Sequence, residues 1–204
     1  MRSKIRVKSN WQKKDHRKKT PQEIAGALAY IVWRTSDNTL KNIRKADFDI
    51  AIGPQYFAFL QEYLIFLVMV ADRIVYTQLS EEGRIEFTGA LANRVAEHQA
   101  ENQAEWLGGA MREYKDSFVD SVNQRAGEYA DFHYTGVETS FSFILYLGQC
   151  MRKVVDEKDK TWVVDQIMAI EVPESVAILE KAMAGLFDDL AKPDSVAEFT
   201  TLTT

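Results

Sequence analysis

One apolar segment limits what this chain can fold into more than any other feature. Residues 56–76 read YFAFLQEYLIFLVMVADRIVY. The first sixteen of them contain two polar side chains, Gln61 and Glu62, if Tyr is counted as apolar. Asp72 and Arg73 then follow side by side before the apolar run resumes. Such a segment is a membrane span, a helix buried in a protein core, or one wall of a polar site.

The polar residues inside the segment argue against a membrane span. A spanning helix needs about 20 mainly apolar residues, whereas the longest run without Gln or charge here is nine residues, 63–71. Glu62 would lie near the middle of any span, where a charge costs at least about 2.5 kcal/mol. A helix that is apolar on nearly all sides is typical of the centre of a helical bundle. We therefore predict a buried central helix and no transmembrane segment.

Capping patterns divide much of the chain into helices. The TPQE stretch at 20–23 combines an N-cap, a proline at the first helical position and a glutamate three residues after the cap. Gly53–Pro54 and Ser80 are further start signals, and Gly108–Gly109 is a stop signal. These signals predict an all-α protein, a single irregular bundle of six to seven helices around a buried central helix at about 54–79.

Three further features of the sequence concern where helices break and where a strand could form instead. The polar residues 36–38 predict a break between a helix over 21–35 and a short one after it. Pro173 predicts the start of a last helix, separate from one over about 161–170. The stretch SFSFILYL at 140–147 alternates at first, so a strand competes there with the predicted helix.

The charges of the central helix require partners. Glu62 and Arg73 share a helix face but lie about 16 Å apart along the axis, too far to pair with each other. Asp72 points to a different side. Buried charges need partners from other helices, so the sequence predicts either ion pairs that join helices or a polar pocket in which Arg73 holds an anionic group.

A second apolar stripe turns polar halfway along its helix. Phe87, Leu91 and Val95 follow one another at helical spacing, and the stripe continues to His98 and Asn102. If the two polar regions met, they would form one site in which Arg73 binds an anion and His98 moves a proton. The candidate polar pocket consists of Glu62, Asp72, Arg73, His98, Glu101 and Asn102.

Motifs that hold metals or cofactors are absent from the sequence. It contains no Glu-x-x-His, no His-Glu-x-x-His, no calcium loop, no cysteine cluster and no glycine-rich phosphate motif. His98, Glu101 and Glu105 have helical spacing but lack the second half that a dinuclear carboxylate site needs. We predict no metal site and no cofactor, and the sequence identifies no catalytic residues.

Charge is distributed unevenly between the N-terminal arm and the body. The first twenty residues hold nine Lys or Arg and one Asp, a net charge of +8, which leaves −13 for the remainder of a chain that totals −5. Such an arm contacts nucleic acid, an anionic membrane surface or the acidic body itself. We predict a flexible basic arm over 1–19, a helical-bundle domain over 20–191 and a frayed tail over 192–204. The candidate anion contacts are Lys13, Lys14, Arg17, Lys18 and Lys19.

Cysteine usage and the N-terminal residues bear on localisation, and the helical pattern bears on function. A single cysteine, Cys150, and the lack of an apolar stretch in the first twenty residues suggest a cytoplasmic protein. We predict a non-enzymatic interaction or regulatory module that self-associates as a dimer or binds a helical partner. One alternative is a small-molecule binding protein or enzyme with the polar pocket above. The other is an adaptor that binds nucleic acid or membrane through its basic arm, and enzymatic activity stays open.

Overall fold

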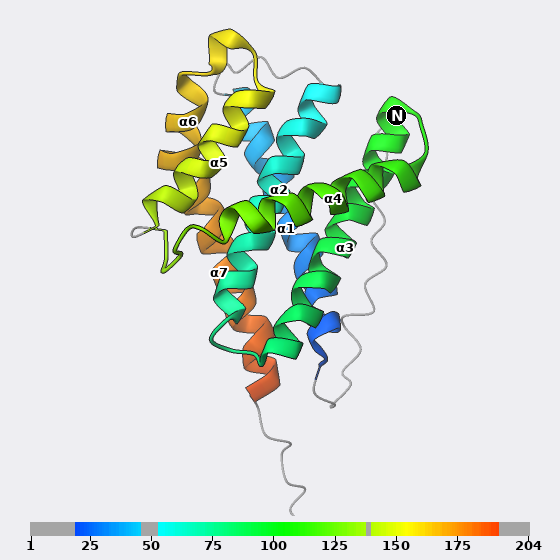
Figure 1. The fold of residues 1–204 in the computed structure, drawn as a ribbon, viewed down its shortest axis with the longest axis vertical. Helices are drawn as coiled ribbons and strands as arrows, with labels where there is room; N and C mark the ends of the chain where they lie inside the picture. Colours follow the sequence, from blue (N-terminus) through cyan, green and yellow to red (C-terminus); the bar gives the residue numbers. More distant parts are fainter. Residues whose placement is uncertain (1–18, 46–52, 138–139, 192–204) are drawn as a thin grey trace, which may run out of the picture.

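The computed structural model describes residues 19–45, 53–137 and 140–191. Every regular element within these ranges is a helix (Figure 1), as the sequence predicted. In chain order the elements are α1 (Pro21–Lys45), α2 (Pro54–Val75), α3 (Glu81–Leu107), α4 (Met111–Tyr129), α5 (Phe141–Val154), the 3-10 turn η2 (Glu157–Asp159), α6 (Trp162–Gln166), the π-helical turn η3 (Ile167–Glu171) and α7 (Val172–Ala191).

The apolar segment forms the central helix of the bundle. α2 packs against α1, α3, α4, α5 and α7, and α4 runs across the front of it (Figure 1). Residues 64–67 point in directions about 100° apart, yet all four are 0% exposed. No helix in the described part of the chain combines the length and the apolar character that crossing a lipid bilayer requires. The prediction of a buried central helix is therefore confirmed.

Local capping explains where several helices begin and end. Glu23 N donates to Thr20 Oγ1 at 3.3 Å, and Thr20 N donates to Glu23 Oε2 at 2.9 Å, the reciprocal pair expected from the sequence. Ser80 Oγ accepts from Gly83 N at the start of α3. Gly108 and Gly109 have φ angles of 75° and 89°, in the left-handed region that glycine adopts at little cost. They end α3 and allow the chain to turn back into α4.

The predicted break at residues 36–38 is wrong, because α1 continues to Lys45. Ser36 Oγ donates to the carbonyl of Val32 at 2.9 Å, a bond within the helix itself. Asp37 forms an ion pair with Lys41 one turn later. Short polar side chains interrupt a helix when they compete for the backbone in other conformations. Here their hydrogen bonds are compatible with the helix, and Ser36 is buried against the core.

The predicted boundary before Pro173 is also wrong, because α6, η3 and α7 follow one another without a gap. Pro173 has no N–H group and cannot donate within a helix. The backbone widens just before it into a π-helical turn, where Val172 N donates to Ile167 O. The chain therefore accommodates the proline with one surplus residue instead of ending the helix.

The segment for which a strand competed is the helix α5. Its Gly148 lies so close to α6 that a Cβ atom built on it would be 2.9 Å from Val164 Cγ1. α5 thus packs tightly on α6 and, on its other side, against α2.

Aromatic rings fill the space between α2, α4 and α5. The rings of Phe66 and Phe143 have centroids 5.8 Å apart, and those of Tyr129 and Phe143 are 4.5 Å apart. Phe66 and Phe143 are both 0% exposed, and Tyr129 is 2% exposed. Burial of large rings supplies much of the apolar stabilisation of a core, so this cluster joins the central helix to the two helices that lie outside it.

Candidate functional site

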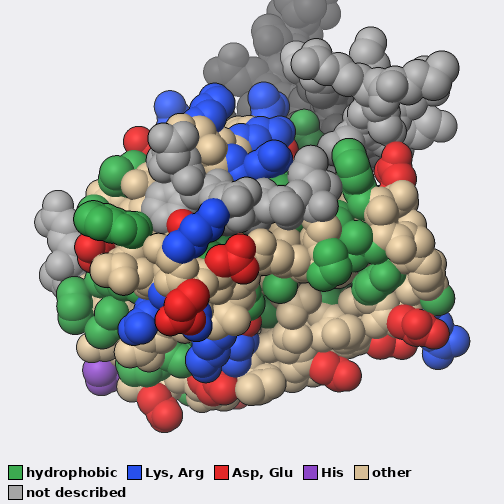
Figure 2. Space-filling model, turned by 90° about the horizontal axis from the view of Figure 1, so that it is seen from above, with side chains coloured by type: hydrophobic (Ala, Val, Ile, Leu, Met, Phe, Trp, Pro, Cys, Tyr) green, Lys and Arg blue, Asp and Glu red, His purple; other side chains and the backbone are tan. Residues whose placement is uncertain are grey.

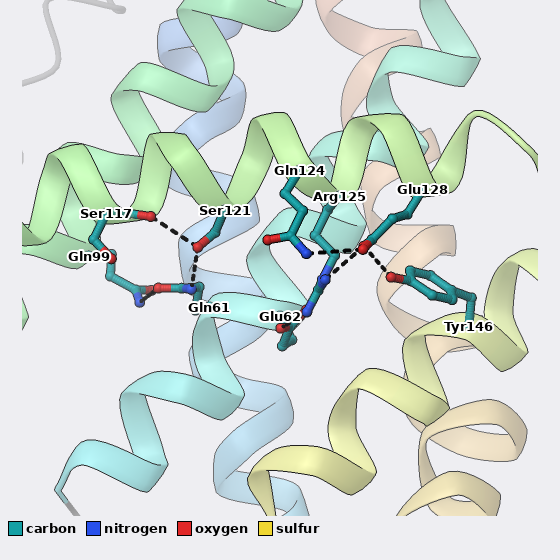
Figure 3. Close-up of polar contacts among 9 residues, drawn as sticks. All are labelled: Gln61, Glu62, Gln99, Ser117, Ser121, Gln124, Arg125, Glu128 and Tyr146. Atoms are coloured by element: carbon teal, nitrogen blue, oxygen red, sulfur yellow. Dashed lines mark hydrogen bonds and ion pairs between the residues drawn. The ribbon is translucent and has the colours of Figure 1, made fainter.

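Gln61 and Glu62 are consecutive residues of the central helix. They bind Ser121 and Arg125, which lie on successive turns of α4 (Figure 3). Gln61 Nε2 donates to Ser121 Oγ at 3.0 Å, and Gln99 Nε2 on α3 donates to Gln61 Oε1 at 3.4 Å. Gln99 Nε2 also donates to the carbonyl of Phe57. Three helices thus meet through amide and hydroxyl groups in a region that is otherwise apolar.

Arg125 of α4 is the centre of the network. Its Nε and Nη2 donate to the two oxygens of Glu62 at 2.9 and 2.6 Å, and its Nη1 donates to Glu128 Oε2 at 2.7 Å. The side chains of Arg125 and Glu62 are only 14% and 12% exposed. The planar guanidinium suits such a two-pronged contact. The hydrogen bonds to Glu62 raise the pKa of Arg125, so the charge is permanent.

Glu128 extends the network from α4 to α5. It accepts from Gln124 Nε2 at 3.1 Å and from the hydroxyl of Tyr146 (Figure 3). The hydrogen bond from Tyr146 lowers the pKa of Glu128 to about 2, with Arg125 contributing in the same direction. Burial, and next the Glu128 contact, raise the pKa of Tyr146. At neutral pH Glu128 is therefore a carboxylate, Arg125 a charged guanidinium and Tyr146 a neutral phenol.

Replacing Tyr146 with phenylalanine is expected to destabilise the protein at neutral pH and to matter less in acid. The pKa of Glu128 is about 2 in the folded protein and ordinarily 4.5. A lowered pKa contributes stability that is complete above pH 4.5 and is lost as the pH falls toward 2. Urea unfolding at a series of pH values should show the deficit of Tyr146→Phe shrinking across this window. Tyr30→Phe, at a tyrosine with an exposed ring, is the control, and a Tyr146→Phe deficit that does not change with pH contradicts the prediction.

Asp72 and Arg73 of the predicted pocket also have partners. Asp72 accepts from Arg84 Nε at 2.9 Å and from Thr88 Oγ1 at 2.7 Å. Arg73 Nη2 donates to the carbonyl oxygen of Tyr129 at 3.0 Å. Glu62 and Asp72 are thus bound by different arginines at different points along α2. Of the two interpretations that the sequence left open, the structure shows contacts of the first kind, in which charges join helices.

The structure does not bring His98 to Asp72 and Arg73. Asp72 lies beside Arg84 in the first turn of α3, and His98 is fourteen residues further on, about 21 Å along the helix. The ring of His98 packs 6.2 Å from that of Trp33, measured between centroids. Burial, with a contribution from Arg94, lowers its pKa and favours the neutral imidazole.

The remaining pocket candidates have local surroundings of their own. Asn102 Nδ2 donates to the backbone carbonyl of His98 at 2.7 Å, within α3. Glu101 is exposed on the surface of the same helix. The six predicted residues therefore do not share one site, although Glu62 belongs to the network around Arg125.

Most of the predicted anion contacts fall in the N-terminal arm. Lys13, Lys14, Arg17 and Lys18 lie outside the described residues, and Lys19 is half-buried just before α1. On the face of the molecule shown in Figure 2, basic and acidic side chains of the described residues are interspersed. The nucleic-acid and membrane hypotheses for the arm stay predictions.

A second group of buried polar contacts was not predicted. The hydroxyl of Tyr63 donates to Ser175 Oγ at 2.8 Å, and Ser175 Oγ lies 3.2 Å from Thr39 Oγ1. All three residues are at most 3% exposed, and burial raises the pKa of Tyr63. The contacts join α1, α2 and α7. Tyr63 and Thr39 are 112 and 136 positions from Ser175 in the sequence, so no local sequence pattern predicts these contacts.

Cys150 is buried, and the charged groups around Arg125 contact one another. Cys150 is 1% exposed, and burial raises its thiol pKa, which keeps it protonated and unreactive. No group of three or more His, Cys, Asp or Glu in the described ranges is arranged to hold a metal ion. The charged groups of the Arg125 network bind one another. These contacts link α2, α4 and α5 to one another.

Comparison with other proteins assigns no relatives to this chain. No protein-family model matches it, and neither a curated protein nor a solved structure shows significant similarity to it. Any function must therefore be argued from the geometry of the molecule itself.

Proposed function

We propose that the protein is a helical interaction module that self-associates through the outward side of α7. The observation that supports this proposal is the exposure of large apolar side chains on that side. Ile178 is 50% exposed, and Ile170, in the η3 turn just before α7, is 47% exposed, although the opposite side of α7 is already buried in the core through Val176, Leu179 and Met183. A helix that is apolar on both sides is normally covered on both sides.

The pairing of the internal charges supports the same proposal. Glu62 and Asp72 are each bound by an arginine, and Arg73 binds a backbone carbonyl. An enzyme or small-molecule site would need polar groups that converge and face a ligand. Surfaces that bind other proteins are instead marked by exposed apolar side chains.

The α3–α4 turn carries a second exposed apolar surface. Trp106 is 60% exposed, and Leu107 and Met111 are 37% and 41% exposed. These residues surround one short turn, whereas Ile178 and the exposed Ala177 and Ala184 lie along a helix of 20 residues. We therefore assign self-association to α7 and use the turn as a comparison in the test.

The full chain is expected to form a concentration-dependent dimer of twice 23.3 kDa. Ile178→Glu is expected to weaken that dimer at least about tenfold, because the interface would have to bury an unpaired carboxylate or open around it. Sedimentation velocity over a dilution series measures both. Trp106→Ser removes an exposed apolar side chain elsewhere and should leave the dimer intact. A chain that stays monomeric at every concentration refutes self-association, and a dimer that Trp106→Ser disrupts while Ile178→Glu does not refutes the assignment to α7.

A further inference from the structure

The outward face of α7 is a narrow stripe of six exposed residues. At about 100° per residue, these positions fall within a sector of about 120° on the side of the helix away from its buried residues. All six are exposed, and a Cβ added at Gly185 would meet open space. The outward face of α7 consists of Glu174, Ala177, Ile178, Lys181, Ala184 and Gly185.

This face carries one charge of each sign. Glu174 and Lys181 are seven residues apart, two turns along the helix, and therefore too far apart to pair with each other. Among the described residues neither side chain takes part in an ion pair. Ala177 and Ile178 lie halfway between them. The two charges are thus equally far from this midpoint and opposite in sign.

That pattern matches a second copy of the same face turned by a two-fold rotation. If the axis passes between Ala177 and Ile178, residue 174 of one copy faces residue 181 of the other, and this contact occurs twice, as in any isologous interface. Opposite charges therefore meet twice in this single register.

A parallel arrangement of two copies fits less well. It would place Glu174 opposite Glu174 and Lys181 opposite Lys181, and like charges at a contact are unfavourable. A partner of another kind would have no reason to match a pattern that is complementary to itself. The charge pattern thus favours the second copy as the occupant of this face.

We infer that two copies of this chain pair through their α7 helices in an antiparallel register, with Glu174 of each copy against Lys181 of the other. The inference rests on the proposed self-association and adds its geometry. The face is narrow compared with the roughly 800 Å² per partner of a standard interface. The dimer is therefore weak, and its two charged pairs govern register more than affinity.

Charge reversal tests the register. Glu174→Lys alone or Lys181→Glu alone turns two attractive contacts into two repulsive ones and should weaken the homodimer about tenfold or more. The double variant Glu174→Lys/Lys181→Glu restores opposite charges and should dimerise as the natural chain does. An equimolar mixture of the two single variants should form heterodimers. Glu180→Lys, a reversal on the same helix but outside the face, is the matched control and should have little effect.

Cysteine pairing gives an independent measure of the same register. Glu174→Cys mixed with Lys181→Cys should yield a disulfide-linked heterodimer on mild oxidation, whereas either variant alone should yield much less. Cys150 is 1% exposed, so the introduced thiols are the accessible ones. Circular dichroism of each variant checks that the helices remain folded.

The possible results separate the two proposals. A natural chain that never dimerises refutes both. A dimer that Ile178→Glu disrupts but that the double charge reversal fails to restore refutes the antiparallel register and leaves self-association through α7 standing. If Ile178→Glu and both single charge reversals leave the dimer affinity unchanged, the dimer forms through another surface. That result also overturns the inference.

Discussion

Replacing Arg125 with alanine is expected to lower the free energy of unfolding by about 3 kcal/mol, the lower end of the range for breaking a buried ion pair. The substitution leaves Glu62, which is 12% exposed, without either of its charged hydrogen bonds. It also removes one of the contacts of Glu128. An uncompensated carboxylate next to the central helix is the main cost. Urea denaturation followed by circular dichroism measures the change.

Arg112 provides the control for this experiment. It lies on the same helix, is 91% exposed, and is 3.6 Å from Asp116. Arg112→Ala should change stability little, since exposed ion pairs contribute little. Arg125→Lys should fall between the two, because lysine keeps the charge and loses the planar fork. If Arg125→Ala is no more destabilising than Arg112→Ala, the network does not hold α4 on α2.

Phe66→Ala is expected to cost about 3 to 5 kcal/mol, the largest effect of any single substitution proposed for this protein. The ring of Phe66 is 0% exposed and lies near those of Tyr63, Tyr129 and Phe143. Removing it takes away buried apolar surface and leaves a cavity between three helices. Thermal and urea unfolding should both show the loss.

Replacing an exposed phenylalanine with alanine separates the effect of burial on stability from the effect of residue type. Phe141 is 64% exposed at the start of α5, so Phe141→Ala should cost far less than Phe66→Ala. Equal losses at the two positions would mean that the cluster around Phe66 is not the packed centre that its ring contacts indicate.

Much of the fold could be predicted because its signals are local. The apolar run of α2, the Thr20–Glu23 capping pair and the Gly108–Gly109 turn each act through neighbours in the sequence. The two wrong boundaries arise where one local contact overrides another local signal. Ser36 and Pro173 usually interrupt helices, but here a bond to Val32 and a π-helical turn accommodate them.

For the candidate site, the sequence could predict that the buried charges of α2 need partners, but not which residues those partners are. The sequence shows that Glu62 requires a cation if α2 is buried, and this requirement is met. It does not show that the cation is Arg125, because the two residues are 63 positions apart and meet only when α4 crosses α2. Arg84 is a partial exception, since it is twelve residues from Asp72 across a short turn between antiparallel helices.

The π-helical turn at Ile167–Glu171 sets the direction in which the exposed side of α7 faces. α6, η3 and α7 together form a rod of roughly 45 Å. Each residue advances a helix by about 100°, so the surplus residue sets the rotation of α7 relative to α6. Deleting it would twist one half of the rod against the other by about that angle. Either α6 would lose its packing on α5, or Ile178 would swing out of its outward orientation.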